Sequence, residues 1–307
     1  MADKNKKLLL IGDNPFHGIS HLSQDKARSR DSDITMAKHA AHLINVAMEN
    51  GASGFLFSVS DTTLSILRIL RQNRQDSEPE LYAIMPYAFE YVRWAVLHGG
   101  ITGLARKVGR QVVFSGNVRA IANGLWGAAR NNPGSLLKAY LSYEVSRIRS
   151  AAGKKANLRS LLLHEVVTDM GLALDMRWLF EAHIEFARGL RIEPGFDTRN
   201  LPYLVKKFGE WQIDFNGLVI AAPFNAAGFQ MCPSREECEE ALVEIPEADI
   251  IAFSLLAAGY LKPQEAAEYV TKLANLKGVV LGVSREEQVS STFRLFNDKL
   301  TSKVLQH

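Results

Sequence analysis

The sequence predicts an α/β protein that folds as one (β/α)8 barrel, the TIM-barrel architecture, over residues 1–307. Short apolar segments alternate with segments of helical spacing along almost the whole chain. The apolar segments are continuous instead of alternating with polar residues, which is typical of parallel strands buried on both faces. There are eight of them, the number that closes a barrel of this kind.

The eight expected strands are spaced along the chain with a helical segment after most of them. They are residues 8–12, 54–59, 81–87, 158–165, 190–193, 217–222, 250–254 and 278–282. A doubly wound open sheet with a helical second domain would show a similar alternation. A glycine-rich fingerprint in the first turn would favour that fold. The first turn here, Gly12-Asp13-Asn14-Pro15, lacks that fingerprint, so the barrel is favoured.

Capping residues indicate where some of the helices begin. Asp61 or Thr62 is expected to cap the helix after the second strand. Ser284, with Glu287 three residues later, forms a capping box before the last helix. Helical spacing also runs over residues 264–276, so two strand-loop-helix units follow one another near the C-terminus.

Residues 89–157 interrupt the alternation and read as a mostly helical insertion after the third strand, within the barrel domain. One short strand is conceivable there, at residues 111–115. Residues 90–157 hold eleven Lys or Arg and two acids, a net charge of 11 − 2 = +9, so the remainder carries 3 − 9 = −6. This uneven distribution of charge is the most unusual feature of the composition, and it makes the segment a candidate for binding or shielding a charged partner.

Three interpretations of the basic insertion are open. As a lid, it would draw an anionic substrate into the barrel mouth and exclude water. It could also be a solvated helical cap or a subunit interface, and an interface would join copies of the chain into a homo-oligomer. Binding of nucleic acid or an acidic membrane is disfavoured because no recognition motif is present. The position after the third strand favours the lid.

Composition narrows the possible classes of protein and its location in the cell. The chain has two cysteines, Cys232 and Cys238, whose spacing and lack of a partner pair make a poor zinc pattern, so we expect free thiols in a reducing compartment. No segment approaches the roughly 18–20 apolar residues of a membrane span. A cytoplasmic location follows as the expectation.

The carboxyl ends of the strands would meet at one mouth of the barrel, where such folds carry their active sites. His164 closes one apolar strand and would act there as general acid/base or as a donor that polarises a carbonyl group. Glu165 and Asp13 are placed to assist it. The alternative is a core histidine that is hydrogen-bonded to a neighbouring loop.

His17 and His21 follow the first strand as an H-x3-H pair and make His17 a further candidate for the site. With Asp13 and Glu165 they could bind a divalent metal. That spacing binds one metal best on a helix, however, and the nearby proline and glycine indicate a loop. Histidines at the rim are therefore favoured over a metal site.

The last two strand-to-helix loops would provide a seat for an anion, as they often do in barrels. Each follows a strand and offers backbone N–H groups before a helix. Gly259 and Lys262 lie in the first of these loops, and Gly282 and Arg285 in the second. A solvated surface charge is the alternative for each cation.

Several segments in the second half of the chain resemble aldo-keto reductases. They are SLLLHEVVTD (160–169), PFN (223–225), IIAFSLLAAGYLKP (250–263) and GVVLGVSREEQVSSTF (278–293). The resemblance implies a barrel in which His164 is the catalytic histidine and Phe253 stacks on a nicotinamide ring. It also implies that NADP is the cofactor and that residues after the last strand hold its adenosine phosphate, namely Gly282, Ser284, Arg285 and Gln288.

The first half of the chain departs from that family. Its catalytic aspartate and tyrosine follow the second strand, where this chain has FSVSDTTL with Ser58 and Thr63. The lysine expected after the third strand is absent from IMPYAFEY. Three of the four catalytic residues, including the tyrosine that protonates the carbonyl, are therefore missing.

The sequence thus predicts a barrel enzyme that acts on a phosphorylated or otherwise anionic small molecule. The anion would rest on the loops 259–262 and 282–285, with His164 as acid/base. If NADP(H) binds there, the enzyme is a divergent oxidoreductase with another proton donor, and otherwise a lyase or isomerase. The alternative is a reductase-like barrel that binds a nucleotide without catalysis.

Overall fold

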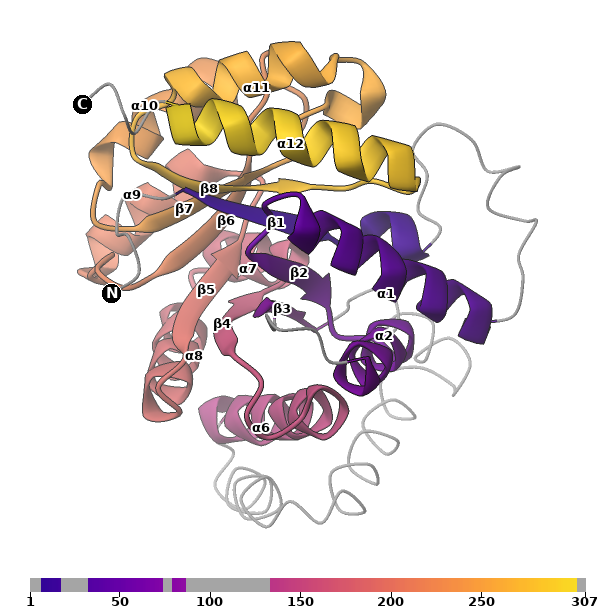
Figure 1. Cartoon of the computed structure of the whole chain (residues 1–307). Coiled ribbons are helices and arrows are strands. Elements are labelled where there is room, and N and C mark those ends of the chain that lie inside the picture. The colour runs from indigo at the N-terminus through magenta and orange to yellow at the C-terminus, as the bar shows by residue number, and fades with distance from the viewer. Residues whose placement is uncertain (1–6, 18–32, 74–78, 87–132, 303–307) are drawn as a thin grey trace, which may run out of the picture.

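The computed structural model describes residues 7–17, 33–73, 79–86 and 133–302 (Figure 1). Its centre is a closed barrel of eight parallel strands in sequence order, with β8 paired to β1. The strands are β1 (Leu8–Gly12), β2 (Gly54–Ser58), β3 (Glu80–Met85), β4 (Leu158–Leu163), β5 (Glu193–Asp197), β6 (Val219–Pro223), β7 (Asp249–Phe253) and β8 (Leu276–Leu281). The predicted fold class is confirmed.

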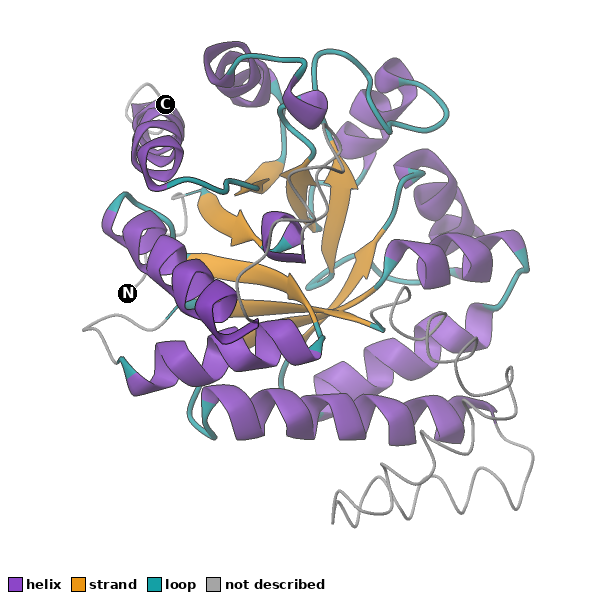
Figure 2. Cartoon of the chain, turned by 90° about the vertical axis from the view of Figure 1, so that its right-hand side faces the viewer, coloured by secondary structure: helices purple, strands orange, loops and turns teal. Residues whose placement is uncertain are grey.

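Helices surround the barrel (Figure 2). They are α1 (Asp33–Glu49), α2 (Asp61–Gln72), α6 (Pro133–Ala152), α7 (Glu165–Ala173), α8 (Arg177–Gly189), α9 (Leu201–Trp211), α10 (Arg235–Glu244), α11 (Pro263–Lys272) and α12 (Glu286–Ser302). Two short 3-10 helices, η1 (Asn14–His17) and η3 (Ala257–Gly259), follow β1 and β7. No helix of the described residues is both long and apolar enough to cross a bilayer.

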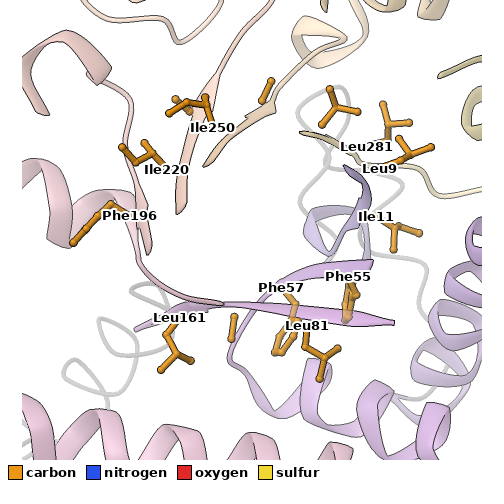
Figure 3. Close-up of a cluster of buried hydrophobic side chains, with 14 of the residues drawn as sticks. Leu9, Ile11, Phe55, Phe57, Leu81, Leu161, Phe196, Ile220, Ile250 and Leu281 are labelled. Carbon is orange, nitrogen blue, oxygen red and sulfur yellow. The ribbon is translucent and has the colours of Figure 1, made fainter. Parts of the chain in front are cut away.

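The strands are apolar throughout because each one is buried on both faces. One face packs inside the barrel through a cluster of nine buried residues. These are Leu10, Leu56, Tyr82, Ile84, Leu162, Val219, Ala221, Ile251 and Val280. The other face packs against the helices, as Figure 3 shows for side chains that include Ile11, Phe55, Leu161 and Phe196. Side chains therefore alternate between the two faces along every strand.

Aromatic rings fill the layer between β5 and the helices α8 and α9. The ring centroid of Phe180 lies 5.5 Å from Phe196, 5.3 Å from Phe208 and 5.3 Å from Trp211. All four side chains are buried. Such tilted and edge-on contacts add to the stabilisation from apolar burial.

The prediction for the fifth strand at residues 190–193 was wrong, because that segment completes α8 and turns. Leu190 caps the helix, and Arg191 adopts a left-handed backbone with φ of 59°. The strand itself begins at Glu193 and contains Pro194 and Gly195, so it has no apolar run. The other seven predicted strands overlap the observed ones.

Two helix boundaries also differ from the prediction. The N-cap of α2 is Ser60, whose hydroxyl accepts the N–H of Thr63 at 3.2 Å, and neither Asp61 nor Thr62 is the cap. The helix predicted over residues 264–276 ends at Lys272, because Leu273 turns to an extended backbone. Asn275 then adopts a φ of 55° before β8 begins.

Part of the predicted basic insertion can be placed. Residues 133–152 form α6, which packs against α2 and α8 in the outer ring (Figure 1). Two of its cations are paired, Lys138 with Glu185 and Arg147 with Asp61. Residues 87–132, with the conceivable strand at 111–115, lie outside the described residues. The lid and the interface remain predictions.

Candidate functional site

A ring of side chains at the C-terminal mouth of the barrel follows from the strand geometry. Successive side chains alternate between the two faces, so the positions two residues beyond the inner cluster also face the barrel axis. These positions are Gly12, Ser58, Pro86, His164, Asp197, Pro223, Phe253 and Gly282. Three of them carry polar side chains and one carries an aromatic ring, which makes this inner ring the candidate site.

His164 lies where β4 passes into α7 and is the N-cap of that helix. Its Nδ1 accepts the N–H of Val166 at 3.2 Å, so the neutral ring carries its proton on Nε2. Burial lowers the pKa of His164 below the usual 6.5, while Glu165 and Asp13 act in the opposite direction. A neutral imidazole with its N–H on Nε2 can donate to a ligand oxygen in the mouth.

Asp13 fixes the start of the first loop to the end of β2. Its Oδ2 accepts the N–H of Ser58 at 2.7 Å, and the side chain is 4% exposed. This contact gives Asp13 a structural role between two neighbouring loops. Its charge also reaches His164, so the structure brings these two predicted site residues close together.

Asp197 ends β5 and is buried on the inner ring, with 7% of its surface exposed. It accepts the backbone N–H of Glu165, whereas its Oδ1 has no hydrogen-bond partner among the described residues. Burial raises the pKa of Asp197 to about 8, and the nearby charge of Glu165 acts in the same direction. At neutral pH the carboxyl group is therefore mostly protonated.

Arg199 connects four consecutive loops of the mouth. Its guanidinium forms an ion pair with Glu165 and donates to Gln230 Oε1 at 2.8 Å. The same group lies 4.6 Å from the centroid of the Phe253 ring, within the range of a cation–π contact. Gln230 Oε1 also accepts the hydroxyl of Ser254 at 3.1 Å.

Asp169 on α7 supports the loop that carries Arg199. Its two oxygens accept the hydroxyl of Thr198 and the backbone N–H of Arg199. Burial raises its pKa, although both hydrogen bonds act against that shift. Both oxygens are therefore occupied by the protein itself.

The two C-terminal loops are exposed. Gly259 has a φ of 91° in η3, and Lys262 precedes α11, where its N–H donates to Glu265 at 3.1 Å. Gly282 and Arg285 lie between β8 and α12. Gln288 lies in the first turn of α12, and Ser284 lies two residues before that helix. Neither cation forms an ion pair within the described part of the chain, so both are available to an anion.

The remaining residues that the sequence singled out contribute less to the candidate site. His17 ends η1, but its side chain and the whole of His21 lie outside the described residues. No group of three potential metal ligands occurs within the described ranges. Both cysteines are free thiols, as expected, with Cys232 exposed and Cys238 buried.

Sequence reasoning missed Arg199 and Gln230 and gave Asp197 no role. The fifth strand was placed too early, so the loop that holds Arg199 was not recognised. Placing β5 at EPGFD would have put Arg199 just beyond the end of a strand. Gln230 lies two residues after Gly228. Its left-handed backbone, with a φ of 62°, is visible only in the structure and not in the sequence.

These features define a (β/α)8 barrel with a polar site at its C-terminal mouth. Neither a protein-family model nor a curated protein matches the sequence. Solved structures with this fold include a Pseudomonas aeruginosa protein classed as an aldo-keto reductase, with a TM-score of 0.59 and 11% identity. That match covers 96% of this chain and 91% of the other.

Two further structures give the same result. A glycerol dehydrogenase from Gluconobacter oxydans matches with a TM-score of 0.51 and 10% identity, over 100% of this chain and 95% of the other. An aldo-keto reductase from Bacillus halodurans in its holo form matches with a TM-score of 0.52 and 11% identity, over 89% and 88%. The chain therefore has the barrel fold that aldo-keto reductases use.

Proposed function

We propose that the protein is a divergent NADP-dependent oxidoreductase that acts on a small molecule in the barrel mouth. The observation that carries this proposal is the inner ring, where His164 and Phe253 stand on the same rim. A histidine that donates from Nε2 and an aromatic ring suit a carbonyl substrate and a nicotinamide. The anion that we expected on the C-terminal loops is then the cofactor's adenosine phosphate.

The residues fit the two ends of this cofactor differently. Lys262 and Arg285 are exposed cations on neighbouring loops, next to backbone N–H groups at helix starts, which suits a phosphate. At the other end, Arg199 covers one face of Phe253. A nicotinamide ring has to use the other face or displace the guanidinium. When bound, NADPH supplies a hydride, and the chain's own residues supply orientation and the proton.

One observation favours a second candidate, a barrel that binds the nucleotide without catalysis. Thr63, near where the aldo-keto reductase pattern has its tyrosine, is fully buried and its hydroxyl donates to the carbonyl of Ser58 at 2.7 Å. Its side chain is thus part of the α2 cap and cannot protonate a substrate. If no other group replaces that tyrosine, binding without turnover is expected.

Fluorescence titration with NADPH tests the proposal. The wild type should bind NADPH, and Arg285→Ala should weaken binding about tenfold through the loss of one charge-assisted contact. NADH binding should stay the same in this variant, because NADH lacks the 2′-phosphate that NADPH carries on its adenosine ribose. Lys272→Ala, which removes an exposed cation at the far end of α11, is the matched control.

The outcomes separate the candidate functions. Binding with reduction of a carbonyl panel supports the oxidoreductase, and binding without turnover supports the non-catalytic barrel. A wild type that does not bind NADPH refutes the nicotinamide proposal. In that case the next hypothesis to test is a lyase or isomerase that acts on a phosphorylated substrate.

A further inference from the structure

We propose that Asp197 works in the mouth as a neutral carboxylic acid that donates a hydrogen bond to an uncharged oxygen of the bound molecule. The inference deepens the proposed function, on which it rests, because it takes the inner ring as the ligand site. It assigns a role to a residue that the aldo-keto reductase resemblance leaves out.

The position of Asp197 comes first. β5 lies between β4 and β6, and its register pairs Leu162 with Gly195. Two residues further along both strands, the same register sets His164 beside Asp197, with backbones about 5 Å apart. Both side chains face the axis, so one small ligand can meet both of them.

The hydrogen bonds of Asp197 are incomplete in a way that points to a ligand. The side chain is more than nine-tenths buried, and within the described part of the chain it is hydrogen-bonded only to the N–H of Glu165. Oδ1 has no partner among the described residues. A buried polar atom without a partner costs about 1–3 kcal/mol, so such atoms usually have a partner or a function.

The charges around Asp197 oppose its ionisation. From α7 it faces the carboxyl groups of Glu165 and Asp169, and among the described residues only Arg199 on its own loop offers a positive charge. Burial lowers the pKa of His164, which follows β4, and so favours its neutral form. On the other side, β6 has no titratable residue. Burial in the barrel adds to this effect, and the pKa of Asp197 rises to about 8. The proton therefore stays on the carboxyl group at neutral pH.

This protonation state selects the ligand chemistry. A carboxylic acid donates to a carbonyl or amide oxygen, and its ionised form repels an oxygen of negative charge. The β4–β5 side of the mouth should therefore hold an uncharged oxygen, while anionic groups of the same ligand lie over the β7 and β8 loops. Aldehydes, ketones and carboxamides fit this description.

The pH dependence of NADPH binding, followed by fluorescence from pH 6.5 to 9.5, tests the inference. In the wild type the Kd should rise about tenfold per pH unit above pH 8, as the donor is lost. Asp197→Asn keeps a donor that does not titrate, so its Kd should change less than about threefold over this range. Asp197→Leu should bind weakly at every pH.

Asp169→Asn is the matched control, because it removes a carboxyl group of the same cluster whose oxygens are both bonded to the protein. It should keep the loss of affinity at high pH, but the loss should begin at a somewhat lower pH, because the charge of Asp169 no longer opposes the ionisation of Asp197. An equal pH dependence in the wild type and Asp197→Asn would overturn the inference.

Infrared titration of the ligand-free protein separates this inference from the proposed function. The wild type should show a protonated carboxyl band at pH 7 that Asp197→Asn lacks. If the band is absent, the inference is wrong even when NADPH binds. If the band is present but the wild type does not bind NADPH, the proposed function fails and Asp197 is still shown to be a neutral acid.

Discussion

Acidification should destabilise the fold through His183, a fully buried histidine on α8. Its Nε2 donates to the carbonyl of Leu161 on β4 at 3.0 Å, and its ring meets Phe196 edge-on at 5.4 Å between centroids. Burial lowers the pKa of His183 from 6.5 to about 4. The folded protein therefore resists a proton that the unfolded chain accepts.

The sign and size of the effect follow from this difference in pKa. Above pH 6.5 the ring is neutral in both states and the folding free energy does not depend on it. Between pH 6.5 and 4 only the unfolded chain binds the proton, so the free energy of unfolding falls by about 1.4 kcal/mol per pH unit. From pH 7.5 to 4.5 the loss is about 2.5 kcal/mol, and it levels off at roughly 3.4 kcal/mol below pH 4.

Urea unfolding at pH 7.5 and 4.5, in the wild type and in His183→Gln, measures the contribution of His183 to this loss of free energy of unfolding. The glutamine amide can still donate to Leu161 but does not titrate, while every other group titrates equally in both proteins. The wild type should lose about 2.5 kcal/mol more than the variant over this pH range. Equal losses would refute the reasoning and place the acid sensitivity elsewhere.

Substitutions at four positions test other parts of the fold. Phe180→Ala should lower the free energy of unfolding by about 3–5 kcal/mol in urea titrations, because it empties the centre of the aromatic cluster. Gly54→Ala would bring a Cβ atom to 2.5 Å from a carbonyl oxygen of β3 and should cost about 1–3 kcal/mol. Gly209→Ala, with no atom within 4 Å, should instead raise stability by up to about 1 kcal/mol. Asp13→Ala should cost about 1–3 kcal/mol by leaving the buried N–H of Ser58 without its acceptor, whereas Asp13→Asn should largely retain stability in the same assay.

The barrel could be predicted from the sequence because seven of its strands are apolar runs, and burial on both faces demands such runs. β5 was not predicted correctly because the packing inside the barrel requires a small residue in this strand instead of an apolar run. A Cβ atom at Gly195 would lie 2.6 Å from the Leu162 side chain and 2.9 Å from the hydroxyl of Ser160. The strand therefore needs a glycine, which sequence patterns assign to a turn.

The site was harder to predict because its contacts join residues that are distant in the sequence. His164 and Phe253 could be named, since each ends an apolar strand. Arg199 could not, because its role depends on Glu165 at the start of α7, Gln230 in the loop after β6 and Phe253 at the end of β7. A single charged residue in a loop carries no local signal of such partners.

The missing tyrosine changes how the proton in the proposed reaction has to be supplied. Reduction of a carbonyl needs a hydride and a proton, and among the residues that the structure describes no tyrosine stands on the inner ring to give the proton. At neutral pH the inner ring holds two groups with a transferable proton, the Nε2–H of His164 and the carboxyl group of Asp197. A neutral histidine is a weak acid, whereas a carboxylic acid with a pKa of about 8 is close to the operating pH, where general acids are most effective. If the protein is a reductase, its rate should therefore depend more on Asp197 than on His164, the reverse of what the sequence resemblance implies.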